Sequence, residues 1–442
     1  MRVTGWECLV CHATVDIATP FPWRCPNSTS WDRHHVLAIV NGDASHVDAL
    51  YQGFVGHGMP VAQAPDPTAN PFISHDSQLA WAAYADANGI DAAARQEMVE
   101  QLDDAVRRVA GVGFVPTPFG RSDALSDALG FTDGGGVWVK EETGGVAGSQ
   151  KARHLFTILL HLAAATRLGH LTDRPPLAIA SCGNAALAAA TLAAAANWPI
   201  DVYVPTWMSD GFGSELDRLG ARAHRCERRP SDPDGDPAMF RFREAVATGS
   251  IPFTVQGPEN ALSLDGGRTL GWEIADQSAV PGVEEGVTLD RIFVQVGGGA
   301  FAACLGAALP GPRLLAVQAE GCAPLRRAWD RAGTDLEGGS RNVAGRWGEL
   351  MTPWRDPHSI ADGILDDETY DWLGVVDAIG GTWGDPPVVA SEADIVAAHQ
   401  LARSAGFDVS PTGSAGLAGL LATVDATQPN ERVAVVMSGV AR

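Results

Sequence analysis

Short apolar runs alternate with stretches of helical spacing along the chain from Pro175 onward. Apolar runs of strand length cover 177–180, 201–205, 291–296, 314–317 and 433–437. Helices are predicted between them at 185–197, 213–219 and 301–309. Apolar strands that alternate with helices are typical of a mostly parallel sheet buried on both faces. The pattern therefore predicts an α/β fold.

Helical patterns also occur before this region. A stretch rich in Ala, Gln, Glu and Arg predicts a helix over 76–109. After Gly148, apolar residues recur with helical spacing over 155–163. The first hundred residues are otherwise the least regular part of the chain. With 442 residues, two or three structural units are expected.

Three loops are expected at the edges of the sheets where ligands bind. Parallel α/β sheets bind ligands at the carboxyl ends of their strands. These ends are followed by the loops after Ala180, Val296 and Met437. Residues that carry chemistry are therefore expected in these loops.

The loop after Ala180 has the polar and small residues of an anion site. Backbone amides at a strand-to-helix turn of this kind bind anions such as a carboxylate. Ser and Asn are also common in ordinary capped turns, which is the alternative interpretation. The residues of the loop are Ser181, Cys182, Gly183, Asn184 and Ala185.

The loop after Val296 is glycine-rich. Glycines allow the backbone to approach a phosphate closely, and the following helix adds its dipole. A tight turn between strand and helix explains the same run equally well. The run matches neither the dinucleotide-binding fingerprint nor the P-loop pattern. Its residues are Gly297, Gly298, Gly299 and Ala300.

Lys151 lies at the predicted start of a helix, after the sequence Gly148-Ser149-Gln150. The positive partial charge at a helix N-terminus disfavours an ammonium group there. The pKa of the amine is therefore expected to be lowered, and the neutral amine is the form that attacks an aldehyde. A solvated lysine at a helix start is the alternative explanation.

Together and in this order, the three motifs resemble those of the fold-type II pyridoxal-phosphate (PLP) enzymes. This group includes threonine synthase, the threonine and serine dehydratases, and cysteine synthase. In the family a Lys-x-Glu stretch leads to Gly-Ser-x-Lys, and Lys140 and Lys151 are eleven positions apart here. The resemblance runs from about Pro116 to the C-terminus.

The resemblance implies two open, mostly parallel α/β domains behind an N-terminal extension. The extension would cover 1–105, with a start that is similar to a degenerate zinc ribbon. The large PLP-binding domain would consist of 106–169 together with 258–442. A small mobile domain would cover 170–257.

The resemblance also implies a role for each motif. Lys151 would hold PLP as a Schiff base and act as the catalytic base. Asn184 would meet the 3'-oxygen of the cofactor, and Ser438 would face its ring nitrogen. The loop at 297–300 would bind the phosphate. The substrate carboxylate would bind to Ser181, Cys182, Gly183, Asn184 and Ala185.

Three positions depart from the family pattern. Ala152 follows the lysine where many relatives have Asp, and Ala300 replaces the fourth glycine of the phosphate loop. The sequence Ser438-Gly439-Val440 has neither the asparagine of the dehydratases nor the His-Gly of the threonine synthases. These differences bear on the substrate rather than on the cofactor.

Cys182 is a candidate second catalytic residue. In relatives its position lies on the cofactor face opposite the lysine, where racemases have a serine that acts as acid and base. Plain dehydratases have alanine there. A thiol can exchange protons, whereas a small buried Cys that only fills space is the alternative.

The N-terminal cysteines Cys8, Cys11 and Cys25 resemble the zinc ribbon in front of some threonine synthases. A structural zinc needs four ligands, and the expected fourth Cys is missing. A ribbon without metal is one alternative, and c-type haem attachment at Cys-x-x-Cys-His is another, which the lack of a recognisable export signal disfavours. We expect no metal among the catalytic residues. The candidates for a fourth zinc ligand are His12, His34 and His35.

Composition narrows the partners and the location. A formal net charge of −22 argues against nucleic acid or an anionic membrane as partner. No run of 18 apolar residues predicts a membrane span. The odd number of cysteines, 7, favours a reduced, cytoplasmic setting over a disulfide framework. The family resemblance implies a homodimer.

The expected reaction is a β-elimination, of the dehydratase or ammonia-lyase type, or a β-replacement on a β-substituted amino acid. Threonine synthase chemistry on a phosphorylated amino acid is the alternative. The ribbon-like N-terminus favours this alternative, whereas the residues that follow Met437 speak against it. A non-catalytic protein that binds PLP or amino acids is the alternative of another class.

Overall fold

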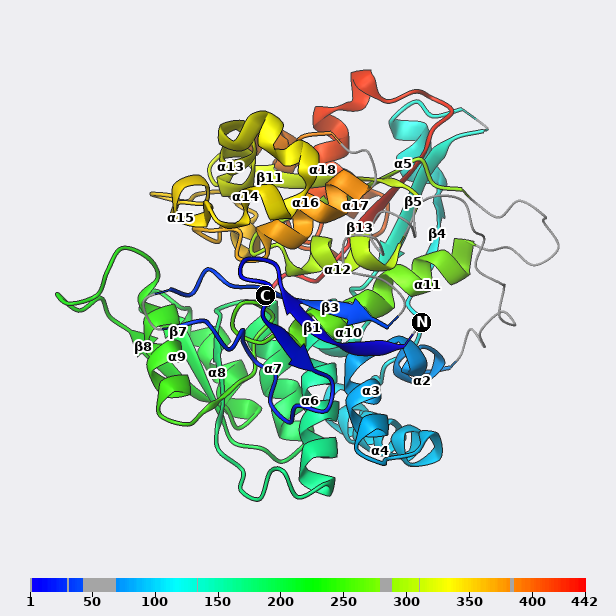
Figure 1. Ribbon diagram of the computed structural model, residues 1–442. Coiled ribbons are helices and arrows are strands. Elements are labelled where there is room, and N and C mark those ends of the chain that lie inside the picture. The colour runs from blue at the N-terminus through cyan, green and yellow to red at the C-terminus, as the bar shows by residue number, and fades with distance from the viewer. Residues whose placement is uncertain are drawn as a thin grey trace.

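Three sheets organise the molecule (Figure 1). The computed structural model describes residues 2–29, 32–42, 69–132, 134–278, 288–309, 311–381 and 385–442. In spatial order, the six-stranded sheet consists of β12 (Val388–Ala390), β11 (Arg313–Ala319), β10 (Arg291–Gln295), β13 (Arg432–Met437), β5 (Gly136–Glu141) and β4 (Phe119–Ser122). The four-stranded sheet consists of β8 (Arg222–Cys226), β7 (Ile200–Pro205), β6 (Leu177–Ala180) and β9 (Ile251–Pro252).

The third sheet is small and lies near the N-terminus. Its strands are antiparallel, in the order β2 (Thr14–Asp16), β1 (Val3–Cys8) and β3 (Leu37–Asn41). In Figure 1 this dark blue sheet lies in front of the two larger sheets.

The two larger sheets are mostly parallel. Among their described strands, only β4 runs antiparallel to its neighbour, β5. All five predicted strands are present, and the predicted α/β fold is confirmed. The carboxyl ends of β6, β10 and β13 lie immediately before the three loops that the sequence singles out.

Helices cover both faces of the six-stranded sheet, and apolar side chains fill both interfaces. On one face are α11 (Arg268–Ser278), α12 (Ala300–Ala308), α13 (Pro324–Ala332), α14 (Ser340–Ala344), α15 (Trp347–Leu350) and α16 (Trp372–Gly381). On the other face are α5 (Asp123–Ala128), α17 (Glu392–Ser404) and α18 (Ala415–Ala422).

The four-stranded sheet has α7 (Asn184–Ala195) on one face and α9 (Pro237–Ala247) on the other, with α8 (Asp210–Arg218) beside β8. Next to α7 is α6 (Lys151–Arg167), which also contacts the helices from the N-terminal part. The N-terminal helices are α2 (Pro71–Ser74), α3 (Ala80–Ala87) and α4 (Ala92–Ala110). From the later chain, α10 (Ser263–Gly266) also packs against α6. Short 3-10 turns cover Asp76–Gln78, Val146–Gly148, Gly333–Gly338, Asp362–Ile364 and Val424–Ala426.

A close backbone approach fixes the start of α6. A side chain at Gly266, in α10, would overlap the carbonyl group of Arg153, so only glycine fits there. The buried side chain of Asp265 accepts hydrogen bonds from the amides of Ala80 (2.9 Å) and Trp81 (3.2 Å). The sequence around Asp265 therefore anchors α3 and α6 to each other.

The single helix predicted over 76–109 is wrong in one respect, because the structure divides it. The helix α3 ends before Gly89, whose φ of 88° is left-handed. Asp91 then caps α4 by accepting a hydrogen bond from the amide of Ala94 at 2.8 Å. A glycine stop and an aspartate cap thus outweigh the helical composition of the stretch.

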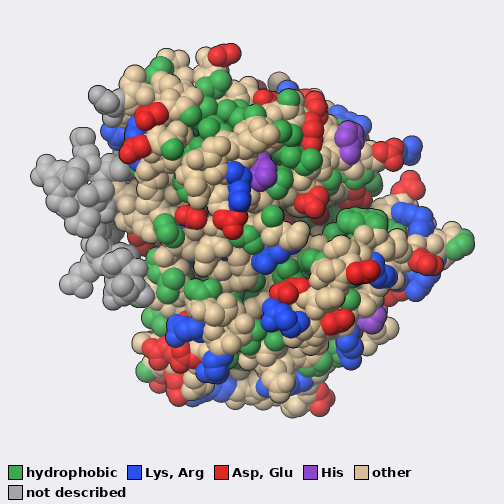
Figure 2. Space-filling model, turned by 180° about the vertical axis from the view of Figure 1, so that it is seen from behind, with side chains coloured by type: hydrophobic (Ala, Val, Ile, Leu, Met, Phe, Trp, Pro, Cys, Tyr) green, Lys and Arg blue, Asp and Glu red, His purple; other side chains and the backbone are tan. Residues whose placement is uncertain are grey.

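Acidic and basic side chains are interspersed over the face that Figure 2 shows, without a continuous basic area among its described residues. None of the described helices is both long enough and apolar enough to span a bilayer.

Candidate active site

The loop before Lys151 pairs with the chain that follows β13. The amide of Gln150 donates to the carbonyl of Ser438 at 3.1 Å, and the amide of Val440 donates to the carbonyl of Gly148 at 3.0 Å. Between these bonds, Ser149 and Gly439 form an antiparallel bridge. Lys151, the first residue of α6, is therefore held beside the carboxyl end of the central strand β13.

Asn184, the first residue of α7, reaches the same place from the other sheet. Its side-chain amide donates to the carbonyl of Val440 at 3.2 Å and its oxygen accepts from Arg442 at 2.8 Å. A side chain at Gly439 would lie 2.8 Å from the Asn184 amide nitrogen, so a glycine is needed there. The structure thus brings together Lys151, Asn184 and Ser438, which the sequence singled out in three separate motifs.

The glycine turn lies between β10 and α12, next to β13. Gly299 caps α12 with a left-handed φ of 95°, which favours glycine. At the end of β10, the side-chain amide of Gln295 donates to the hydroxyl of Ser438 at 2.5 Å. The turn at Gly297, Gly298 and Gly299 is therefore adjacent to the same strand end as Lys151.

Lys151 is partly buried, and its amine makes no hydrogen bond or ion pair with any described residue. Burial lowers the pKa of Lys151, while the carboxylates of Asp366 and Asp371 act in the opposite direction. The direction agrees with the lowered pKa that the sequence predicts for a lysine at a helix start. An amine in these surroundings is available as a nucleophile or a base.

Two acidic residues that the sequence analysis missed lie near Lys151. Burial raises the pKa of Asp366 to about 6 and that of Asp371 to about 7. One oxygen of Asp371 accepts from the amide of Gly257 at 3.1 Å, and the other has no described partner. Both residues follow the short 3-10 turn Asp362–Ile364, and no local sequence motif marks them.

Cys182 lies in the loop between β6 and α7 and is partly buried. Burial, and then the negative charges of Asp362, Asp236 and Asp366, raise the pKa of Cys182 to about 11. The side chain is therefore a thiol at neutral pH, which can donate a proton but is a weak base.

The rest of this loop forms the N-terminus of α7. Gly183 is the cap residue of the helix, and its amide donates to the Ser181 hydroxyl at 3.3 Å. Asn184 and the buried Ala185 are the first two residues of the helix. The free backbone amides at the N-terminus of a helix suit a carboxylate.

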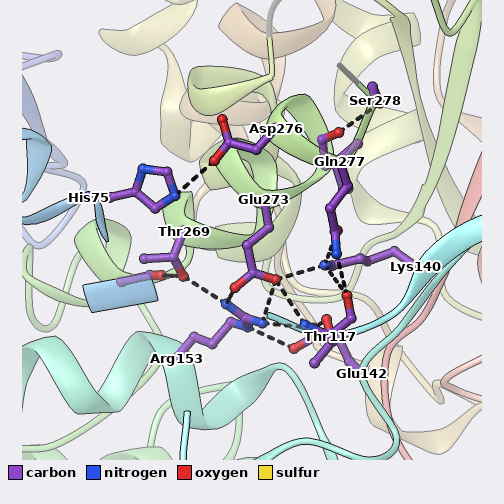
Figure 3. A network of polar contacts seen from close by, with 12 residues as sticks. His75, Thr117, Lys140, Glu142, Arg153, Thr269, Glu273, Asp276, Gln277 and Ser278 are labelled. Carbon is purple, nitrogen blue, oxygen red and sulfur yellow. Dashed lines mark hydrogen bonds and ion pairs between the residues drawn. The ribbon is translucent and has the colours of Figure 1, made fainter. Parts of the chain in front are cut away.

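Lys140 lies in a different environment, shown in Figure 3. It is fully buried and its ammonium group contacts Glu273 at 2.7 Å, the carbonyl of Thr117 at 2.8 Å and the side chain of Gln277 at 2.8 Å. These three partners use all three of its donors. Lys140 is therefore a structural residue with no free amine.

The network continues from Glu273 to Arg153 in α6. The Arg153 guanidinium contacts Glu273 at 2.6 and 3.0 Å and Glu142 at 2.8 and 3.1 Å. Both carboxylates are buried, and they raise the pKa of Arg153. Charges that are paired in this way stabilise the junction of β5, α6 and α11 rather than carry out chemistry.

The residues around Lys151 fit the PLP that the family resemblance implies. The hydroxyl of Ser149 is buried and has no described hydrogen-bond partner. A Cβ atom at Gly298 would meet nothing closer than 3.4 Å, so the turn is open on that side. Glycine turns suit phosphates, because the backbone can approach closely and its amides can donate to the phosphate oxygens. A covalent anchor, an anion site and the Ser438 hydroxyl are thus available in one place.

Asp366 lies against the same turn, where a side chain at Gly297 would overlap its carboxyl group. Its pKa is raised to about 6, and an anion bound at the turn would raise the pKa further, toward the neutral form at physiological pH. A protonated Asp366 is therefore compatible with a phosphate at this position.

A cavity of about 710 Å³ opens nearby, between Asp234 on the side of the four-stranded sheet and Trp354 and His358 on the other side. None of the predicted cofactor residues lines it. The amide of Trp354 donates to the carbonyl of Asp367 at 2.7 Å, which connects the cavity wall to the acidic segment near Lys151.

The three N-terminal cysteines come together with one histidine. The sequence leaves the fourth ligand open between His12, His34 and His35. His35 is the histidine that joins the cysteines, whereas His12 pairs with Glu7 and His34 stacks on Trp347. The cluster consists of Cys8, Cys11, Cys25 and His35.

A family model described as pyridoxal-phosphate dependent enzyme matches residues 111–439. A search of curated proteins found no match.

Solved structures of several PLP enzymes share the fold. Threonine deaminase isoform 2 from Solanum lycopersicum has a TM-score of 0.58 and 18% identity, over 78% of this chain and 90% of its own. Serine racemase from maize has a TM-score of 0.57 and 18% identity, over 77% of this chain and 92% of its own. Diaminopropionate ammonia lyase from Escherichia coli has a TM-score of 0.57 and 15% identity, over 78% of this chain and 89% of its own.

Proposed function

The chain belongs to the family of pyridoxal-phosphate dependent enzymes, and on this premise we propose that it catalyses a β-elimination or β-replacement on a β-substituted amino acid, with Lys151 as the residue that binds PLP. The observation that carries the proposal is the convergence of the Lys151 loop, Asn184 and Ser438 at the end of β13. Among the described residues, the amine of Lys151 has no partner there, whereas that of Lys140 has three.

The other cofactor contacts follow from the same arrangement. The turn formed by Gly297, Gly298, Gly299 and Ala300 is proposed to bind the phosphate, because it combines glycines with the N-terminus of α12. Asn184 and Ser438 are proposed to contact the cofactor ring. When bound, PLP stabilises negative charge at the α-carbon of an amino acid.

Lys151 is proposed to remove the α-proton as the general base. A base must be unprotonated near neutral pH, and burial lowers the pKa of Lys151 in that direction. The N-terminus of α7, from Ser181 to Ala185, would orient the substrate by its carboxylate. Ser438 presents a neutral hydroxyl, which cannot hold a ring nitrogen protonated as a carboxylate would. This favours prompt loss of a β-substituent over the accumulation of charge.

The charges near Cys182 favour some substrates over others. Asp362 and then Asp236 act on its thiol with negative charge. A phosphorylated side chain would be repelled there, whereas a neutral hydroxyl or a cationic amino substituent would not. The acidic surroundings thus favour a dehydratase or ammonia-lyase reaction over threonine synthase chemistry.

A screen of amino acids tests the reaction. Hydroxy-, amino- and phospho-amino acids are incubated with the holoenzyme, and keto acid, ammonia and phosphate are measured by mass spectrometry and coupled assays. Keto acid and ammonia from a β-substituted substrate support the proposal. Phosphate release alone would favour threonine synthase chemistry, and bound cofactor without any turnover would favour a non-catalytic binding protein.

A homodimer in the cytoplasm completes the proposal. The dimer follows from the family resemblance, and the location follows from the reduced cysteines, since all 7 are free. Light scattering coupled to gel filtration would detect the dimer by its mass.

A further inference from the structure

Three thiols and one imidazole converge at the tip of the N-terminal sheet. The ligand atoms of Cys8, Cys11, Cys25 and His35 all lie within 4.8 Å of one another. The Cys8 sulfur is 3.3 Å from Nδ1 of His35, and the sulfurs of Cys11 and Cys25 are 3.4 Å apart. A tetrahedral Zn²⁺ with bonds of about 2.0–2.3 Å holds its ligand atoms roughly 3.5–3.8 Å apart. We infer that these four residues bind one structural Zn²⁺ ion.

The surroundings of the four side chains suit thiolate ligands. The backbone amide of Asn27 donates to the sulfur of Cys25 at 3.4 Å, and its side-chain amide donates to the sulfur of Cys11 at 3.4 Å. On His35, Nδ1 faces the sulfurs while Nε2 lies 3.4 Å from a carboxylate oxygen of Asp32. A carboxylate behind a metal-binding imidazole fixes its orientation and tautomer.

The other histidines of this region are committed to different partners. His12 Nδ1 lies 3.0 Å from a carboxylate oxygen of Glu7, and the ring of His34 stacks on Trp347 with centroids 5.1 Å apart. Haem attachment at Cys8 and Cys11 is excluded by space, since Cys8 is completely buried. The residue that replaces the missing fourth cysteine of the ribbon is thus His35.

The site is closed and belongs to the scaffold. Four protein ligands fill a tetrahedral Zn²⁺ and leave no position for a substrate. Binding displaces the protons of three thiols into solvent, so the metal has a neutral imidazole and three thiolates around it.

The chain between the ligands is bound to the segment that leads from β9 to α10. Arg24 and Arg33 both pair with the buried carboxylate of Glu259, on the segment that leads from β9 to α10. The carbonyl of Trp23 accepts from the amide of Ala261 at 2.9 Å. Because Trp23 and Arg24 immediately precede Cys25, and Arg33 lies two positions before His35, we expect the metal to hold the segment around Glu259 in place.

Metal analysis of the purified full-length protein tests the inference. Mass spectrometry of the digested protein should find about one zinc per chain. His35→Ala should lose it, whereas the matched changes His12→Ala and His34→Ala should keep it. Cys11→Ser should also lose zinc, while Cys226→Ser, a free thiol outside the cluster, should not. A protein without zinc, or full zinc in His35→Ala, would overturn the assignment.

Two further measurements apply where a variant does not fold. X-ray absorption on the native protein should show three sulfur ligands and one nitrogen ligand around zinc. A shell of oxygen and nitrogen only, or a disulfide between Cys11 and Cys25 found by peptide mapping, would contradict the site. Removal of zinc by a chelator should lower Tm, and added Zn²⁺ should restore it.

Discussion

Two clusters of ionisable residues involve the first residues of α6, and they differ in how their charges are matched. The first contains Lys140, Glu142, Arg153 and Glu273, and every charge in it faces an opposite charge at 2.6–3.1 Å. The second contains Lys151, Asp366 and Asp371, and the described residues offer Lys151 no hydrogen bond.

The pKa values reflect this difference. In the paired cluster, the pKa of Glu273 is lowered by Arg153 and Lys140 against the effect of burial. In the second cluster, burial raises the pKa of Asp366 and Asp371 toward neutrality. Buried groups that titrate near neutral pH are typical of functional sites, whereas saturated pairs are typical of scaffolds. Two lysines of the same motif thus have separate tasks.

The change Lys151→Ala should have the largest effect on function. It removes the proposed anchor and base, so turnover should fall by at least about 100- to 10,000-fold. Borohydride reduction followed by peptide mapping should find the pyridoxyl group on Lys151 in the wild type. A label on Lys140 would reverse the roles assigned to the two clusters.

The change Gly298→Asp should abolish cofactor binding. A carboxylate in the glycine turn adds bulk and repels the phosphate dianion. The control is Gly298→Ala, whose added carbon would meet nothing closer than 3.4 Å and should keep the cofactor. PLP content per chain, measured after alkaline release, distinguishes the two. Full PLP content in Gly298→Asp would remove the turn from the site.

The change Lys140→Met should affect stability rather than chemistry. Removal of one partner from a buried ionic network costs about 3–5 kcal/mol, because the remaining charges are left without full compensation. Urea denaturation should show this loss, and borohydride should still label Lys151. A stable variant that no longer binds PLP would contradict the structural role of Lys140.

The change Cys182→Ala tests the second catalytic group. If the thiol delivers a proton on the face opposite Lys151, α-deuterium exchange should slow about 100-fold for one enantiomer only. Equal rates for wild type and variant would leave Cys182 as a residue that fills space.

The change Asp366→Asn should have the smallest effect, and it depends on pH. With its pKa raised to about 6, the native PLP-free protein holds a proton that the unfolded chain loses near pH 4. Stability from this group is therefore present below pH 4 and lost as the pH rises to 6. At pH 8 the variant should be more stable than wild type by the order of 2 kcal/mol, with no difference near pH 4. Denaturation of both PLP-free proteins across this range measures it.

The sequence by itself determined the alternation of strands and helices, because buried parallel strands are apolar throughout. It also singled out the three motifs at 148–151, 181–185 and 297–300, since glycines, small polar residues and helix starts are local signals. Gly89 is also a local signal, for the break between α3 and α4, but the helical composition of the surrounding residues concealed this break.

The tertiary structure alone decided which charges meet. Lys140 and Glu273 are 133 positions apart, and no local spacing relates them. The same holds for Asp366 and Asp371 near Lys151, and for the choice of His35 over His12 and His34. Periodicity and turn chemistry act over a few residues, whereas burial and pairing depend on segments that only the folded chain brings together.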